Sequence, residues 1–350
     1  MSLRSLFKYW NEFFFKPQSP TPVCLFRILY GIVVLADLTM LRPEWLMWYG
    51  PHAFVSLETT NKISRATSMS LFAILPQTDL AISIFFWVFL GCAVFLTMGF
   101  MTRFTSVAVY VCLGSIEMRN GFILNSGDTL LLVTGFFLMF APCAANLSVD
   151  HWLRVRRGKA DVSVPLFSPW AQRMLQIQTA IVYFATFYWK SMGILWINGT
   201  AVYYALHLQD FHRFPLPPLQ NLFLIKSLTW TTLLIEFALG VLVWFKELRY
   251  PVLLAGLCLH LGIEYSMNIP LFEWIMVATY VNFIDPEDLS RTWNWVHGLF
   301  MKSPGKFAHI HAVEQVAGQP QQFYTSETSI VEIEDLFQST RASGTAQHNG

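Results

Sequence analysis

Residues 80–98 read Leu80-Ala-Ile-Ser-Ile-Phe-Phe-Trp-Val-Phe-Leu-Gly-Cys-Ala-Val-Phe-Leu-Thr-Met98, and this stretch decides the fold. It contains no charged side chain. Its length matches the ~20 apolar residues that a helix needs to cross the hydrocarbon core of a bilayer. The whole chain has this character, because 54% of its 350 residues are hydrophobic and only 13% are charged, where a soluble domain carries about 25%. The sequence therefore predicts an all-α integral membrane protein.

Apolar segments of this kind recur along the chain and predict a polytopic transmembrane helical bundle with about eight spans. The third segment is short and ends in Glu117 and Arg119, and the last two are separated only by the residues between Met267 and Pro270, so seven or nine spans remain alternatives. The eight predicted spans are residues 21–41, 80–98, 104–119, 128–145, 171–190, 227–245, 250–267 and 270–285.

Basic residues in the loops predict how the spans are oriented. If the N-terminus is cytoplasmic, every even-numbered gap between spans also lies on the cytoplasmic side and carries Lys or Arg, as the positive-inside rule requires. We therefore expect a multi-pass protein with both termini in the cytoplasm. The basic residues in question are Arg103, Arg154, Arg156, Arg157, Lys159, Lys246 and Arg249.

The composition also predicts what flanks the transmembrane domain, which we assign to residues 19–287. Residues 1–18 and 288–302 carry apolar side chains at helical spacing, so we expect each to form a short helix in the interface plane. Residues 303–350 are polar and lack apolar periodicity, which predicts a disordered cytoplasmic tail. The net charge of +1 gives no sign of a nucleic-acid partner, and the five scattered cysteines indicate buried thiols, with no metal site and no disulfide framework.

Charged side chains within the predicted spans are costly in hydrocarbon, so we expect them to face the bundle interior and pair with one another. We interpret Arg27 and Asp37 as structural pairs with other helices, and Glu236 as a neutral or hydrogen-bonded core carboxylate. With the predicted orientation, Asp37 and the remaining ionisable groups fall in the outer half of the bilayer. They predict one outward-facing polar pocket, formed by Asp37, Glu117, Arg119, Asp128, Lys190, His260, Glu264 and Glu273.

Lys190 is the residue in this pocket that is best suited to a chemical role. It ends an aromatic helix pattern and shares a face with Tyr183 and Phe187, at positions i+7, i and i+4. One interpretation is that its ammonium extends to the lipid headgroups; the other is that partial desolvation lowers its pKa and makes it a general base. Aromatic rings beside an amine and carboxylates suit a flat amphipathic ligand such as a quinol.

His260 has two interpretations as well. It could be a hydrogen-bonded core residue, or Glu264, one helical turn away on the same face, could fix its tautomer and raise its basicity.

Several motifs follow one another along the chain: Phe26-Arg27 with Asp37, Leu147-Ser-Val-Asp150, Ile181-Val-Tyr-Phe184, Lys190, Trp196, Gly199, His260 and Met267-Asn-Ile-Pro-Leu-Phe272. Their order and spacing resemble the membrane domain of the vitamin K-dependent γ-carboxylases. Through the run Trp196-Ile-Asn-Gly-Thr-Ala-Val-Tyr-Tyr204, the chain is also similar to the bacterial relatives called HTTM-domain proteins. The resemblance covers roughly residues 20–290 and predicts a location in the bacterial inner membrane.

The resemblance implies a chemistry and a site. In the carboxylases, a lysine at the position of Lys190 deprotonates vitamin K hydroquinone. The implied cofactor is therefore a reduced naphthoquinone, either vitamin K-like or menaquinol, acting with O2 and CO2. Lys190 and His260 are the implied catalytic residues. The substrate-binding residues that we expect are Tyr183, Phe187, Trp196, Asn125, Asp128 and Glu264.

The chain also departs from the carboxylase pattern. It has Asn125-Ser-Gly-Asp128 where the carboxylases carry a functional histidine, and it ends soon after the bundle, without their large luminal region. Two functions therefore remain: a quinol-dependent, carboxylase-like enzyme, or a non-catalytic membrane binding or assembly module that retains the fold. The sequence predicts contact with the lipid bilayer and names no protein partner.

Overall fold

The structure is a computed structural model that describes residues 3–63, 70–161, 163–208, 211, 213–214 and 220–300. Within these ranges the chain is helical, and the one β-bridge is isolated, between Gln18 and Phe167. The predicted all-α class is therefore confirmed. The tail predicted to be disordered, residues 303–350, lies outside the described residues.

Each predicted span contains a helix. Within the part of the chain that the structure describes, three segments are long and apolar enough to cross a membrane by length and composition, namely Thr21–Tyr49, Asp79–Met98 and Leu222–Trp244, and Ser126–Phe140 is a shorter apolar helix. A membrane protein is thus supported, whereas the number of about eight spans stays a prediction. The helices are α2 (Thr21–Leu41), α5 (Asp79–Met98), α6 (Thr102–Arg119), α7 (Ser126–Phe140), α9 (Trp170–Ser191), α12 (Leu222–Val241), α13 (Lys246–Ser266) and α14 (Phe272–Thr279).

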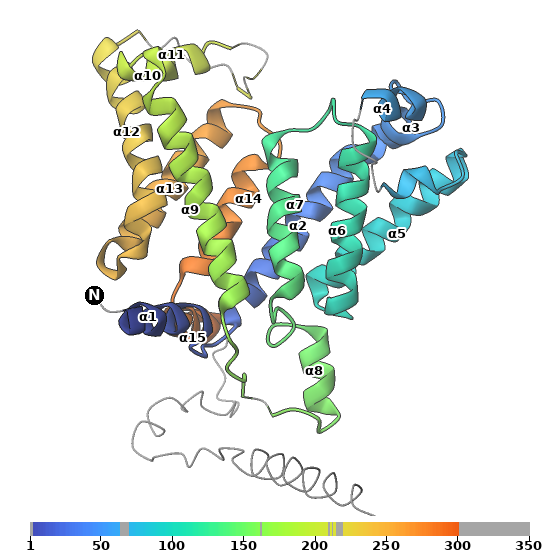
Figure 1. Ribbon diagram of the computed structural model, residues 1–350, viewed down its shortest axis with the longest axis horizontal. Coiled ribbons are helices and arrows are strands. Elements are labelled where there is room, and N and C mark those ends of the chain that lie inside the picture. The colour runs from blue at the N-terminus through green and yellow to red at the C-terminus, as the bar shows by residue number, and fades with distance from the viewer. Residues whose placement is uncertain are drawn as a thin grey trace, which may run out of the picture. The chain divides into compact units, whose positions relative to one another are not determined.

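Short helices gather at the two ends of this bundle (Figure 1). At one end lie α1 (Leu3–Phe15), α8 (Val149–Arg156) and α15 (Pro286–Phe300); at the other lie α3 (Trp45–Tyr49), α4 (Leu57–Ile63), α10 (Ile194–Ile197) and α11 (Ala201–Ala205). Short 3-10 turns complete the chain: η1 (Arg42–Glu44), η2 (Leu71–Ala73), η4 (Leu242–Trp244) and η5 (Tyr280–Phe283). The connections between successive long helices lie at alternate ends of the bundle, as expected for consecutive spans. The basic helix α8 lies at the same end as α1 and α15.

The helices pack mainly on their neighbours in the chain. Contacts run from α2 to α5, α6, α7, α9, α12 and α13 in turn, and α14 returns to contact α2, α7 and α13. This return places α14 between the first and last parts of the bundle. It also brings the end of the α13–α14 hairpin beside α7, since a Cβ atom on Gly127 would lie 3.0 Å from the backbone nitrogen of Phe272.

Arg27 forms a joint at the α8 end of the bundle. Its side chain is fully buried and donates hydrogen bonds to the backbone oxygens of Cys143, at 2.8 Å, and Leu147, at 2.5 Å. Gly99, at φ +72°, ends α5 beside it, and any side chain there would overlap the guanidinium. Arg27 was predicted to pair with other helices, but its two shortest hydrogen bonds go to carbonyl groups in the turn between α7 and α8, and only a longer one, at 3.5 Å, reaches a helix, at Thr97 of α5.

Asp150 belongs to the same joint. Its carboxylate accepts hydrogen bonds from the backbone nitrogens of Met101, at 2.9 Å, and Thr102, at 2.8 Å, and so caps the start of α6. The motifs at Phe26-Arg27 and Leu147–Asp150 thus hold the fold together at this end.

The cysteines are all free thiols in the described chain. Cys24, Cys112 and Cys143 are buried as predicted and Cys92 is half-buried, whereas Cys258 is exposed and contradicts the prediction. Hydrocarbon accepts a small apolar side chain as readily as a protein core does, so an apolar segment does not by itself indicate burial within the protein.

Candidate functional site

Lys190 lies near the end of α9 and turns toward α12. Its Nζ atom is hydrogen-bonded to Oε1 of Glu236, a residue in the second half of α12 whose side chain is only 8% exposed. The same Nζ atom lies 4.9 Å from the centre of the Trp196 ring, which α10 supplies. The amine is therefore held between a buried carboxylate and an aromatic face, with 32% of the lysine side chain still exposed.

One oxygen atom of this ion pair has no hydrogen-bond partner among the described residues. Oε2 of Glu236 is buried and forms no hydrogen bond with any described residue. Phe187 on α9 packs against Phe237, the residue after Glu236, at 5.2 Å between ring centres. A hydroxyl group brought next to Lys190 would find a free hydrogen-bond acceptor here.

His260 lies at the centre of a second, fully buried chain of polar groups. Its Nδ1 atom is hydrogen-bonded to Oε2 of Glu273, and its Nε2 atom lies 2.5 Å from the hydroxyl of Tyr183. That hydroxyl in turn lies 2.6 Å from the hydroxyl of Tyr280. With Glu273 ionised, Nδ1 carries the proton, so Tyr183 donates to Nε2 and Tyr280 donates to Tyr183. All the donors in this chain then point toward Glu273.

Glu236 and Glu273 both interact electrostatically with the Tyr183 hydroxyl. No hydrogen bond between described residues joins the Lys190–Glu236 pair to the chain of polar groups at His260. Oε1 of Glu273, like Oε2 of Glu236, has no hydrogen-bond partner among the described residues.

Glu264 does not form the predicted pair with His260. It forms an ion pair with Arg213, at 2.7 Å, and accepts a hydrogen bond from Nε1 of Trp274, at 3.2 Å. Glu273 takes the expected place beside the imidazole instead. The i, i+4 spacing puts Glu264 on roughly the same helix face, but the antiparallel α13–α14 hairpin brings Glu273 closer.

Asn125 and Asp128, predicted to bind substrate, cap the start of α7. The Asn125 side chain accepts from the backbone of Gly127, at 2.6 Å, and Asp128 accepts from the backbone of Asn125, at 2.8 Å. Asp128 also lies in electrostatic range of Asp37 and Glu117. None of these three carboxylates forms an ion pair with a described residue.

Arg119, expected in the same pocket, turns away from these carboxylates. It donates hydrogen bonds to the backbone oxygen of Val55, at 2.9 Å, and to Oγ1 of Thr60, at 3.3 Å. The predicted polar groups thus divide into separate sets of contacts. Lys190 contacts both Trp196 and Glu236. Tyr183 is bonded to His260, which is bonded to Glu273, and Asn125 and Asp128 belong to the cap of α7.

Sequence reasoning missed two members of the site. The sequence analysis interprets Glu236 as a core carboxylate. Its position inside the span that follows Lys190 was a signal that the two residues could pair, because consecutive spans are antiparallel neighbours. Tyr280 gave no signal, because a tyrosine at the end of an apolar segment is equally typical of the membrane interface.

The fold and the site define a helical membrane protein with buried ionisable groups between its helices. Comparison with known families agrees with this class: the HTTM domain matches residues 15–287. The chain belongs to the HTTM domain family, whose members are membrane proteins related to the vitamin K-dependent carboxylases.

Two curated relatives are similar at low identity, and both come from Bacillus subtilis (strain 168). Uncharacterized protein YitO is 21% identical over 251 residues, which cover 69% of this chain and 80% of YitO. Sporulation-delaying protein SdpB is 20% identical over 208 residues, which cover 58% of this chain and 64% of SdpB. No solved structure matches the chain.

Proposed function

We propose that the protein carries out quinol-dependent proton-transfer chemistry in the membrane, with Lys190 as the general base and Glu236 as its partner. The observation that carries this proposal is the position of the Lys190 amine, which turns into the bundle against a buried carboxylate instead of extending freely to the headgroups. A lysine that only anchors the helix end needs no buried partner.

The Lys190–Glu236 pair can make a base in a way that a lone lysine cannot. Transfer of the ammonium proton to Oε1 of Glu236 leaves a neutral amine and a neutral carboxylic acid, which partial burial favours over two separated charges. The amine can then accept a proton from a bound hydroxyl group. The resulting ammonium stabilises the anion that forms, while the Trp196 ring holds the amine in place.

The cofactor that the family implies is a reduced naphthoquinone, and the residues present fit it. Its ring would lie near Trp196 and Phe187, and its hydroxyl group would meet the unpartnered Oε2 of Glu236. When bound, such a quinol would supply an acidic hydroxyl group and the electrons that reduce O2. Tyr183, His260 and Glu273 form a separate buried hydrogen-bonded chain, to which the pair has no hydrogen bond among the described residues.

Lys190→Arg tests the base assignment, because arginine keeps the charge and the ion pair but does not give up its proton at working pH. We expect it to fold, and to lose turnover of reduced menadione by about 100-fold or more, as removal of a general base does. The assay follows oxygen-dependent quinol oxidation by purified protein. Glu236→Gln, which cannot take the lysine proton, should show the same loss.

The alternative function, a non-catalytic membrane module, predicts a different pattern. Lys190→Arg would then equal the wild type in every assay, and no reduced quinone would turn over. Quinone identified by mass spectrometry in the purified wild type, and lost from Lys190→Ala, would favour the proposed chemistry.

We further propose that about eight helices span the bilayer with both termini in the cytoplasm. A reporter fused after Arg157 should then be cytoplasmic, and one fused after Trp196 should lie outside, because α8 and α10 are at opposite ends of the bundle. Alkaline phosphatase and green fluorescent protein fusions at both sites give opposite readouts. The reverse pattern would place the Lys190 site on the cytoplasmic side and contradict the orientation.

A further inference from the structure

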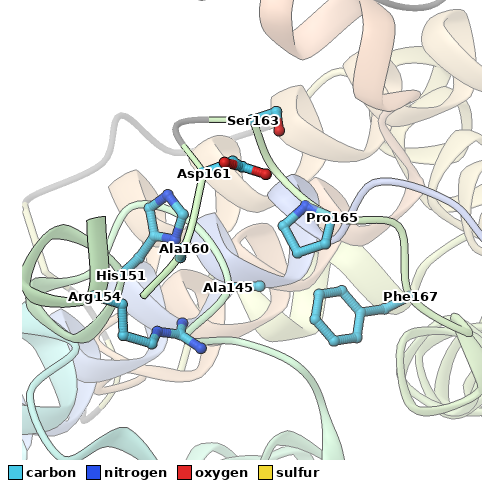
Figure 2. A pocket seen from close by; sticks show the side chains of 8 residues that line it. All are labelled: Ala145, His151, Arg154, Ala160, Asp161, Ser163, Pro165 and Phe167. Carbon is cyan, nitrogen blue, oxygen red and sulfur yellow. The ribbon is translucent and has the colours of Figure 1, made fainter. Parts of the chain in front are cut away.

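A cavity of about 260 Å³ lies at the α8 end of the bundle, away from Lys190. Figure 2 shows His151 and Arg154 on one side, both supplied by α8, and Phe167 on the other, with Asp161 and Ser163 on the loop between them. Ala145, Ala160 and Pro165 complete the lining. The cavity therefore combines an apolar wall with a small number of polar groups.

The charges in this cavity do not neutralise each other. The Arg154 guanidinium donates to the backbone oxygens of Ala144, at 3.0 Å, and Asp150, at 3.3 Å, but forms no ion pair with a described carboxylate. Asp161 has neither an ion pair nor a hydrogen bond with any described residue. Burial, together with Arg154, lowers the pKa of His151, so its ring is neutral at pH 7. The cavity thus presents one separated cation and one separated anion.

The surroundings of the cavity are typical of a membrane interface. Trp152 on α8 is 54% exposed, and Arg156 lies over its ring at 5.2 Å. Leu166, next to the lining residues Pro165 and Phe167, is 64% exposed. Exposed apolar and aromatic side chains beside arginines favour the boundary between headgroups and acyl chains.

We propose that this cavity binds the headgroup of a zwitterionic phospholipid that carries a primary ammonium, phosphatidylethanolamine, with its phosphate at Arg154 and its ammonium at Asp161. An arginine suits a phosphate, and a free carboxylate suits an ammonium that can donate hydrogen bonds. An anionic headgroup would meet the Asp161 carboxylate, and a choline headgroup has no N–H to donate. The exposed Trp152 and Leu166 favour a lipid over a soluble phosphate ester.

Native mass spectrometry of the detergent-purified full chain tests this proposal. The protein is titrated with dioleoyl phosphatidylethanolamine, phosphatidylcholine and phosphatidylglycerol. We expect phosphatidylethanolamine to bind about 10-fold more tightly than phosphatidylcholine, the scale of one charge-assisted hydrogen bond. Equal binding of the two, or tightest binding of phosphatidylglycerol, would overturn the proposal.

Asp161→Asn is the deciding variant, because Asp161 has no bond to a described residue and its loss should leave the fold intact. It should abolish the preference for phosphatidylethanolamine over phosphatidylcholine and leave phosphatidylcholine binding unchanged. Arg154→Gln should weaken binding of all three lipids. Glu58→Gln on α4, at the other end of the bundle, is the matched control and should change nothing. A preference that survives in Asp161→Asn would place the ammonium elsewhere.

Discussion

Replacing His260 with leucine should lower the free energy of unfolding by about 3–5 kcal/mol, the usual effect of leaving a buried charge, here the Glu273 carboxylate, without its partner. The substitution leaves the Glu273 carboxylate at 2% exposure with neither oxygen bonded to a described side chain. It also removes the acceptor of the Tyr183 hydroxyl, which keeps only Tyr280. Reversible unfolding in mixed micelles, followed by tryptophan fluorescence, measures the loss.

A double-mutant cycle separates the pair from simple packing. The double variant His260→Leu/Glu273→Leu should be less destabilised than the sum of the two single variants, because it removes the unpaired charge together with its partner. His52→Leu on an exposed turn is the matched histidine control and should stay within about 0.5 kcal/mol of wild type. Strictly additive effects would mean that Glu273 and His260 are not coupled.

Arg27→Met should destabilise the protein by about 2–6 kcal/mol, because two buried backbone oxygens lose their donor and each unsatisfied acceptor costs about 1–3 kcal/mol. Methionine fills much of the same volume, so the loss of stability measures the contribution of the hydrogen bonds to Cys143 and Leu147. Thermal unfolding in detergent measures it. Arg103→Met, an exposed arginine at the start of α6, is the control. If both variants unfold alike, Arg27 does not hold the joint.

The helical class and the approximate places of the helices followed from the sequence, because long apolar runs without charges have few other structures available in a bilayer. The eight predicted segments each contain a helix, although only three meet the length and composition of a clear span. The predicted interfacial segments 1–18 and 288–302 also contain helices, α1 and α15. Their placement in the interface stays a prediction.

The partners within the site were harder to predict, because they depend on how separate helices face each other. Lys190 and Glu236 lie on consecutive long helices, and His260 and Glu273 lie on the two arms of a hairpin. Helical periodicity relates residues within one helix, so it selected Glu264, whose partner Arg213 comes from a loop without any periodic pattern. Asn125 and Asp128 satisfy a helix-capping pattern, and this local role was overlooked in favour of a ligand.

The joint at Arg27 has a consequence for how the chain is made. The acceptors of its two shortest hydrogen bonds lie 116 and 120 residues further along the chain. A ribosome that adds ~5–20 residues per second needs roughly 6–23 seconds to supply the first of them. During that interval the first span contains a charge that lipid tolerates poorly. We therefore expect nascent α2 to stay beside the insertion machinery, with Arg27 near water, until the turn after α7 has been synthesised. Arg27 can then form its hydrogen bonds, and α2 and α7 can enter the bilayer together.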